Sequence, residues 1–204
     1  MKTVITIDFD IIMAPSINLY NNDVPRATWD ILLNSPYMQL LTIDSWHYQR
    51  LTQFILKCFS QMDKENIHFI NSHEHVVNCI RDNEEYSIVN IDHHHDVCYN
   101  PKDIENKCDE LTCANWLKWL RENKIIRRYL WIHNKNSTMP ADDIKDMVDT
   151  EITIEDFDLD KLAVPDELVI CLSPSWVPPN YRDLFFIWMD IANTIYHIHF
   201  DLED

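Results

Sequence analysis

Short apolar segments recur along the chain, and polar residues follow each of them directly. Residues 4–7 (VITI) are apolar or β-branched, and Asp8 and Asp10 come immediately afterwards. Runs of this length and composition are typical of buried strands in a parallel sheet. The same pattern predicts further strands at residues 67–70, 87–91, 129–132 and 168–172.

Between the predicted strands, apolar residues are spaced three or four positions apart, as in amphipathic helices. This spacing predicts helices over residues 46–62, 113–123 and 181–197, and Asp44 is a candidate N-cap of the first. Strands that alternate with helices predict the α/β class, with a mainly parallel sheet covered on both faces in a three-layer α/β/α arrangement. Such sheets bind ligands beyond the carboxyl ends of their strands, where this chain has its polar clusters.

The length of the chain fits one domain. A chain of 204 residues is long enough to bury a sizeable core, so we expect residues 1–204 to form a single domain. Residues 134–166 depart from the apolar pattern because they are rich in aspartate and glutamate. We expect this acidic stretch to be a solvated insertion or lid rather than a second domain.

Charge and composition narrow the function classes. The formal net charge of −17 repels phosphate backbones and anionic lipid, which argues against nucleic-acid binding. The N-terminus lacks the long apolar run of a signal peptide, and no segment approaches the roughly 20 apolar residues of a membrane span. The sequence thus predicts a cytoplasmic protein with no membrane partner. Its six cysteines include no C-x-x-C pair, which argues against a disulfide framework or a cysteine-rich zinc module.

Glycine is absent from the sequence, whereas average usage of about 7% would give roughly 14 residues. The glycine loops that cradle phosphate in P-loop and dinucleotide-binding proteins are therefore excluded. Backbone positions with positive φ are expected to be occupied by asparagine or aspartate.

The densest cluster of potential metal ligands follows the predicted strand at residues 87–91. Asp92, His94 and Asp96 form a D-x-H-x-D motif. Unpaired carboxylates and imidazoles at a buried strand end are costly unless something neutralises them, which favours a bound metal ion over a packing role. Mixed oxygen and imidazole donors favour manganese, iron, zinc or cobalt over calcium. The alternative interpretation is a solvated polar turn after a core strand.

Two other predicted strands end in residues of the same kind. Asp8 and Asp10 form a D-x-D pair, which alone is equally typical of turns and helix caps. His73 and His75 follow a third strand, and each is either a metal ligand or an ordinary histidine. Carboxylates from two strand ends can bridge two metal ions about 3.5 to 4 Å apart. The predicted metal ligands are therefore Asp8, Asp10, His73, His75, Asp92, His94 and Asp96.

These motifs resemble those of a known family. The D-x-H-x-D at residues 92–96, preceded by the strand end at residues 72–75 (SHEH), is similar to the metal motifs of the arginase and deacetylase (ureohydrolase-like) superfamily, in style closest to small peptide arginases. Members of that superfamily hold two manganese ions, or one zinc ion, at the end of a parallel sheet. Their D-x-D motif comes last along the chain, whereas Asp8 and Asp10 come first here.

The resemblance implies an arginase-like metallohydrolase domain that cleaves guanidino carbon–nitrogen bonds. The implied cofactor is two Mn²⁺ ions, with Fe, Co or Zn as alternatives, and the implied substrate is an arginine-containing peptide or a small guanidino compound. Hydrolysis of peptidyl arginine would yield ornithine and urea. The candidate groups for proton transfer are His93, His95 and His133. Glu74 is the candidate carboxylate clamp for the guanidinium group.

Two other functions compete with this one. Asp92, His93 and His94 also resemble the D-H-H motif of a manganese-dependent phosphoesterase family, in which an aspartate pair comes first along the chain. The acidic net charge and the missing glycine-containing substrate motif argue against that function. A non-catalytic, metal-stabilised binding protein would instead have a closed site with every coordination position filled. The sequence leaves the oligomeric state open.

Overall fold

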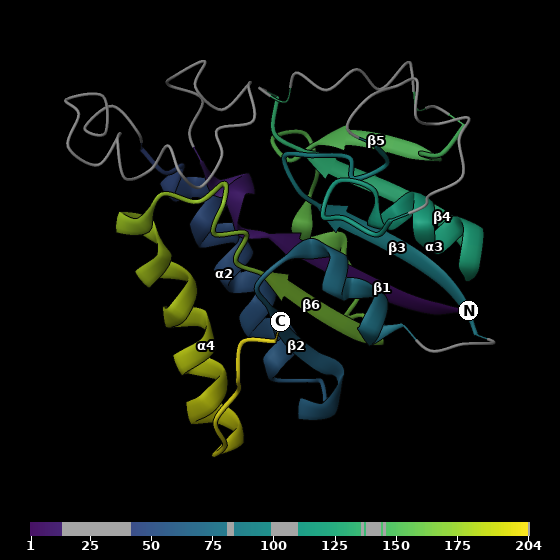
Figure 1. Cartoon of the computed structure of the whole chain (residues 1–204). Helices are drawn as coiled ribbons and strands as arrows, with labels where there is room; N and C mark the ends of the chain where they lie inside the picture. Colours follow the sequence, from purple (N-terminus) through teal and green to yellow (C-terminus); the bar gives the residue numbers. More distant parts are fainter. Residues whose placement is uncertain are drawn as a thin grey trace.

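In the part of the chain that the computed structural model describes, six parallel strands form one sheet (Figure 1). The described residues are 1–13, 42–80, 84–98, 110–135, 137, 144 and 146–203. The order across the sheet is β2-β6-β1-β3-β4-β5, and every neighbouring pair is parallel. The strands are β1 (Lys2–Asp8), β2 (Ile67–Ile70), β3 (Glu85–Ile91), β4 (Ile125–His133), β5 (Thr150–Thr153) and β6 (Glu167–Cys171).

Helices cover both faces of this sheet. α2 (Ser45–Phe59) and α4 (Arg182–Tyr196) pack on one face, whereas α3 (Trp116–Asn123) and the 3-10 segment η4 (His73–Cys79) pack on the other (Figure 1). The predicted three-layer α/β/α fold with a mainly parallel sheet is therefore confirmed. The other 3-10 segments in the described residues are η1 (Phe9–Ile12), η3 (Lys64–Asn66), η6 (Leu159–Lys161) and η7 (Pro179–Tyr181).

The observed elements follow the hydrophobic pattern of the sequence. Each predicted strand forms, and each predicted helical segment overlaps one of the α-helices of the described residues, which are α2, α3 and α4. The predicted N-cap is confirmed, because the Asp44 carboxylate accepts hydrogen bonds from the backbone N–H groups of Trp46 and His47 at 2.9 and 3.0 Å. Among the described residues, no helix has the length and apolar character needed to cross a membrane.

The apolar pattern does not predict β5. This strand lies within the acidic stretch 134–166, pairs with the end of β4, and is followed by the buried side chains of Ile154 and Leu159. The stretch thus contributes an edge strand and core residues. A solvated insertion or lid, as expected from the sequence, would contribute neither. A four-residue strand among acidic residues offers too few apolar positions for a periodic signal. Residues 136, 138–143 and 145 of the stretch lie outside the described residues.

The central strand β1 carries two buried polar side chains. Val4 packs with η4 and α3, whereas Ile5 and Ile7 pack with α2 and α4. Because side chains alternate along a strand, Thr6 and Asp8 face the η4 side, where both are buried. A polar side chain in this position needs partners, and these come from η4, which supplies His73 to both, and from Ser173, which follows β6.

Positive φ angles occur at Asp96 (54°), Ser173 (47°) and His197 (54°) among the described residues. His197 ends α4 in the left-handed conformation that glycine usually supplies, so histidine and serine as well as the expected aspartate occupy such positions. Asp96 follows β3 and Ser173 follows β6. A left-handed conformation costs a residue other than glycine about 1–3 kcal/mol and is concentrated at functional sites.

Two adjacent phenylalanines of α4 give a matched test of core packing. Phe185 is fully buried and packs edge-on against Phe9 and Phe69, with ring centroids 5.7 and 5.9 Å apart, whereas Phe186 is 39% exposed. We predict that Phe185→Ala lowers the free energy of unfolding by about 3–5 kcal/mol. Phe186→Ala should change it by about 0.5 kcal/mol or less. Urea denaturation measures both, and equal losses would contradict the packing of α4 described above.

Candidate metal centre

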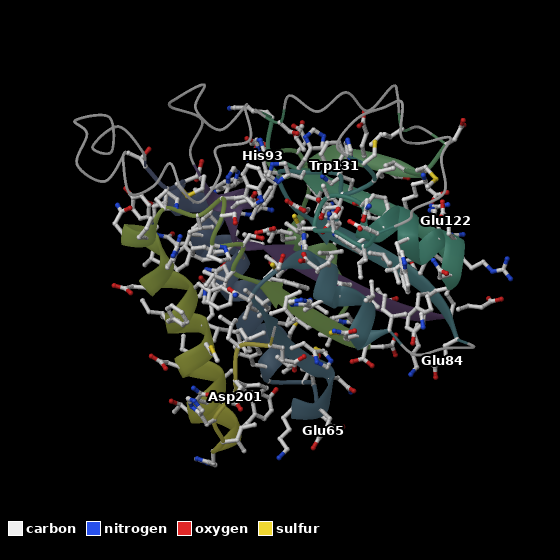
Figure 2. All side chains as sticks on the ribbon, in the orientation of Figure 1. Glu65, Glu84, His93, Glu122, Trp131 and Asp201 are labelled. Atoms are coloured by element: carbon white, nitrogen blue, oxygen red, sulfur yellow. The ribbon has the colours of Figure 1, made fainter. Side chains whose placement is uncertain are left out.

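The candidate centre lies where the chain leaves β1 and β3 in opposite directions. These strands are neighbours, and Ile7 pairs with Ile91 near their carboxyl ends. From β1 the chain continues through α2 to β2 on one side of the sheet, and from β3 it continues through α3 to β4 on the other. Open α/β sheets bind ligands at such a switch point. Figure 2 shows His93 and Trp131 at this end of the sheet, and Glu84 near the opposite end.

A first group of potential ligands contains Asp10, Asp92 and His94. Nδ1 of His94 lies 3.0 Å from Oδ2 of Asp10 and 3.6 Å from Oδ1 of Asp92. One ligand atom from each of the three residues lies within 4.8 Å of the others. Both carboxylates are buried, whereas the His94 side chain is 18% exposed. His94 is therefore the member of this group that reaches the surface.

A second group lies deeper and contains His73, Asp92 and Asp96, with Asp8 beside them. Nδ1 of His73 is 2.8 Å from Oδ2 of Asp96, 3.2 Å from Oδ2 of Asp92 and 3.4 Å from Oδ2 of Asp8. Despite these neighbours, Nδ1 is buried without a hydrogen bond of acceptable geometry. Asp92 belongs to both groups, because its Oδ1 faces His94 and its Oδ2 faces His73.

Hydrogen-bond donors from the surrounding elements hold each of the four carboxylates. A carboxylate fixed in this way keeps its orientation whether or not a cation is present, which is the arrangement expected around metal ligands. The donors are the Ser173 hydroxyl to Asp8 (2.5 Å), the Asn90 amide to Asp92 (3.2 Å), the Trp116 indole to Asp96 (2.5 Å) and the His93 backbone N–H to Asp10 (3.4 Å).

The two imidazoles are supported differently. Nε2 of His73 lies 2.8 Å from the Thr6 hydroxyl, so a proton on Nε2 can be donated to that oxygen while Nδ1 presents its lone pair to the carboxylates. The ring of His94 lies 5.0 Å from the half-buried ring of Trp176, in the loop after β6. Arg182 fixes this loop by donating to the Val177 carbonyl at 3.0 Å. Both imidazoles thus have an aromatic neighbour, since the ring of Trp116 lies 5.4 Å from that of His73, and Thr6 gives His73 a polar support in addition.

Burial and mutual repulsion set the pKa values of the carboxylates. Burial, with the charges of Asp10 and Asp92, raises the pKa of Asp8 well above its usual range. Burial and Asp92 raise the pKa of Asp96 to about 8. Burial also opposes ionisation of Asp92, but His73 and His94 outweigh it and hold the Asp92 pKa well below its usual value. Without a metal ion, the cluster therefore carries fewer negative charges than its four carboxylates would otherwise give it.

The neighbouring carboxylates also shift the pKa values of the two imidazoles. Burial alone would lower the pKa of His73 and of His94, but the neighbouring carboxylates, Asp8 for His73 and Asp10 for His94, raise both values well above the usual range. Every ion pair that the four carboxylates make within the described residues is with a histidine. Protons thus provide the positive charge that this cluster requires when no other cation is present.

His93 and His133 lie beside the groups but not in them. Nδ1 of His93 is 2.9 Å from the amide oxygen of Asn134, an acceptor, so Nδ1 carries the proton and Nε2 is left with a lone pair. Burial lowers the pKa of His93, which keeps the ring neutral. His133 stacks on Trp131 at 4.2 Å and lies 3.0 Å from the Asn134 carbonyl through Nδ1.

Three other predicted site residues are placed outside both groups. Nδ1 of His95 accepts a hydrogen bond from the Val97 backbone at 3.0 Å, and burial lowers the His95 pKa to about 4. His75 belongs to neither group of potential ligands in the described residues, although its Nδ1 is buried without a partner. The Glu74 carboxylate accepts a hydrogen bond from the Ser72 hydroxyl. Of the seven predicted ligands, the structure thus brings together all except His75.

Four residues that border the ligands were not predicted from the sequence. In the sequence, Cys171 is typical of a core residue and Ser173 of a loop residue. Both lie beside Asp8, because β6 is next to β1 and Asp8 pairs with Cys171. Asn90 and Thr6 read as polar positions inside apolar strands. A buried polar residue two positions before a predicted ligand, on the same strand face, is the signal that could have identified these two.

Comparison with known proteins assigns the chain to no family. No protein-family model matches it, and neither a curated protein nor a solved structure does. The geometry of the centre and its motifs are therefore the basis for a function.

The shifted pKa values predict how the stability of the metal-free protein depends on pH. The pKa values of His73, His94 and Asp96 are raised in the folded state, so the folded protein keeps protons that the unfolded chain has released. Stability should therefore fall as the pH rises from 6.5, the usual pKa of histidine, to about 8, the raised pKa of Asp96.

Below this window the lowered pKa values of His93 and His95 act in the opposite direction, because there the unfolded chain binds the extra protons. Urea denaturation of chelator-treated protein at pH 6.5 and at pH 8 measures the predicted change. A higher stability at pH 8 would contradict the charge arrangement described here.

Proposed function

We propose that this protein is a metal-dependent hydrolase with a binuclear centre at the carboxyl ends of β1 and β3. The observation that carries the proposal is the position of Asp92, whose two carboxylate oxygens face two different sets of ligands. Bridging carboxylates of this kind are typical of two-metal sites, in which the ions lie about 3.5–4 Å apart. One ion would be held by His73, Asp96 and Asp8, and the other by His94 and Asp10.

The chemistry of the ligands supports the same proposal. Four buried carboxylates have no lysine or arginine partner in the described residues and need a positive charge. Nδ1 of His73, which makes no hydrogen bond of acceptable geometry, lies 2.8–3.4 Å from three of them. Thr6 lies at the second ring nitrogen, as a supporting group does behind a metal-bound histidine. Oxygen and imidazole donors suit Mn²⁺, with Fe, Co or Zn as alternatives.

The proposed substrate is a guanidino group, in an arginine-containing peptide or a small molecule. The similarity of the D-x-H-x-D and D-x-D motifs to those of the arginase and deacetylase superfamily supports it, since both motifs meet in one centre although Asp10 and His93 are 83 positions apart. The acidic surroundings favour a cationic substrate over the phosphodiester of the competing phosphoesterase function. The substrate would approach from His94 and Trp176, where the centre reaches the surface.

Two metal ions in this centre would supply a water-derived nucleophile near neutral pH. The chain would supply the proton transfer, and His93 is the best placed of the three predicted histidines. Asn134 holds its Nδ1–H, its Nε2 is free to accept a proton, and its lowered pKa keeps the ring neutral. His95 is less suited, because its Nδ1 is engaged with the backbone of Val97.

The bridging role of Asp92 predicts an unequal loss of metal among variants. After loading with Mn²⁺, the unmodified chain should retain two ions, His73→Ala and His94→Ala one each, and Asp92→Ala none. His68→Ala is the matched control, since His68 pairs with Glu167 outside both groups of ligands. Elemental analysis of the dialysed proteins gives the counts. Two ions retained by Asp92→Ala would refute the binuclear centre.

The hydrolase activity has a separate test. With Mn²⁺ present, the protein should release urea from an arginine-containing peptide, and chelation should abolish the release. His93→Ala should lower the rate by about 10²–10⁴-fold, the usual contribution of a positioned acid or base, while metal content stays at two ions. His133→Ala is the control. Cleavage of a generic phosphodiester without urea release would contradict the guanidino substrate and favour the phosphoesterase function.

A further inference from the structure

The deep half of the centre contains a potential ligand of a different chemical kind. The Cys171 side chain is fully buried, and its sulfur, one carboxylate oxygen of Asp8 and one nitrogen of His73 all lie within 4.8 Å of one another. Asp8 and Cys171 are paired across β1 and β6. Both side chains belong to the face of the sheet that η4 and α3 cover, so they lie side by side beneath His73.

The Cys171 sulfur takes part in the hydrogen-bond network of the centre. Sγ of Cys171 lies 3.2 Å from the hydroxyl oxygen of Ser173, and that hydroxyl donates to Oδ2 of Asp8. The thiol thus belongs to the polar network of the centre rather than to apolar packing alone. A second observation points to a ligand in the same place, because Nδ1 of His73 is buried without a hydrogen-bond partner.

We propose that the deep half of the centre binds a borderline divalent ion such as Zn²⁺ or Co²⁺, with Cys171 as a thiolate ligand beside His73 and Asp8. This proposal rests on the metal centre proposed above. The thiol proton leaves to solvent as the sulfur–metal bond forms, so the charge on the sulfur is neutralised by the ion. Ser173 then acts as a positioning residue that lies between the thiolate and the carboxylate.

The two halves of the centre would consequently prefer different metals. The outer group offers carboxylate oxygens and one imidazole, from Asp10, Asp92 and His94, and such donors suit Mn²⁺. Thiolate ligands select softer ions, so a sulfur beside His73 shifts the preference of the deep half toward Zn²⁺ or Co²⁺. A preparation exposed to both kinds of ion is then expected to take up one of each.

Titration of metal-free protein with Co²⁺ tests this assignment. Cobalt that is bound to a thiolate shows a charge-transfer band in the near ultraviolet, whereas cobalt bound only to oxygen and nitrogen shows the weaker visible bands alone. We expect the near-ultraviolet band in the unmodified chain and its loss in Cys171→Ala. Cys58→Ala should keep it, and Cys58 is a matched control because it is equally buried but lies on the opposite face of the sheet.

X-ray absorption at the zinc edge supplies a measurement that needs no variant. The zinc-loaded, unmodified chain should show a sulfur neighbour at about 2.3 Å. Visible cobalt bands without the charge-transfer band, together with a zinc spectrum lacking sulfur, would overturn the role of Cys171 while leaving the binuclear centre intact. A band that persists in Cys171→Ala would also overturn it. Failure to bind cobalt or zinc would refute this assignment, whereas the proposed function would fall only if the protein did not bind Mn²⁺ either.

Discussion

The structure depends on the convergence of negative charge at the ends of two adjacent strands. β1 and β3 deliver Asp8, Asp10, Asp92 and Asp96 into one buried region, and the charged partners that they have within the described residues are imidazoles. Such a cluster is tolerated only with donors for its oxygens and a cation for its charge. The fold provides the donors from Ser173 after β6, Trp116 of α3 and Asn90 of β3. Protons on the histidines, or metal ions in their place, provide the cation.

The two halves of the centre differ in their exposure to solvent. The His73 half is enclosed beneath η4 and α3, whereas the His94 half reaches the surface beside Trp176. In the proposed binuclear centre, an enclosed ion would hold and orient Asp92, while an ion near the surface would be accessible to a substrate. Buried polar supports such as Thr6 and Asn90 belong to the enclosed half, which is where misplacement of a ligand would be most costly.

The sequence predicts the strands, the helices and most of the centre because two elementary rules apply. Apolar runs mark buried strands, and ligands of parallel sheets gather at carboxyl ends, so Asp10 and His94 could be assigned to one edge before their 3.0 Å contact was known. The order of strands across the sheet has no such signal. That order brings β1 next to β3 and Cys171 next to Asp8, and it explains why a D-x-D that comes first in the chain still meets the later motif. The local sequence pattern predicts neither strand β5 nor the position of His75 outside both groups of ligands.

The most direct test of the account is anomalous diffraction from a crystal of the protein soaked in Mn²⁺. We expect two peaks about 3.5–4 Å apart, with the Asp92 carboxylate between them, one peak beside His73 and the other beside His94. No peak at the carboxyl ends of β1 and β3, or a single peak remote from Asp92, would contradict it.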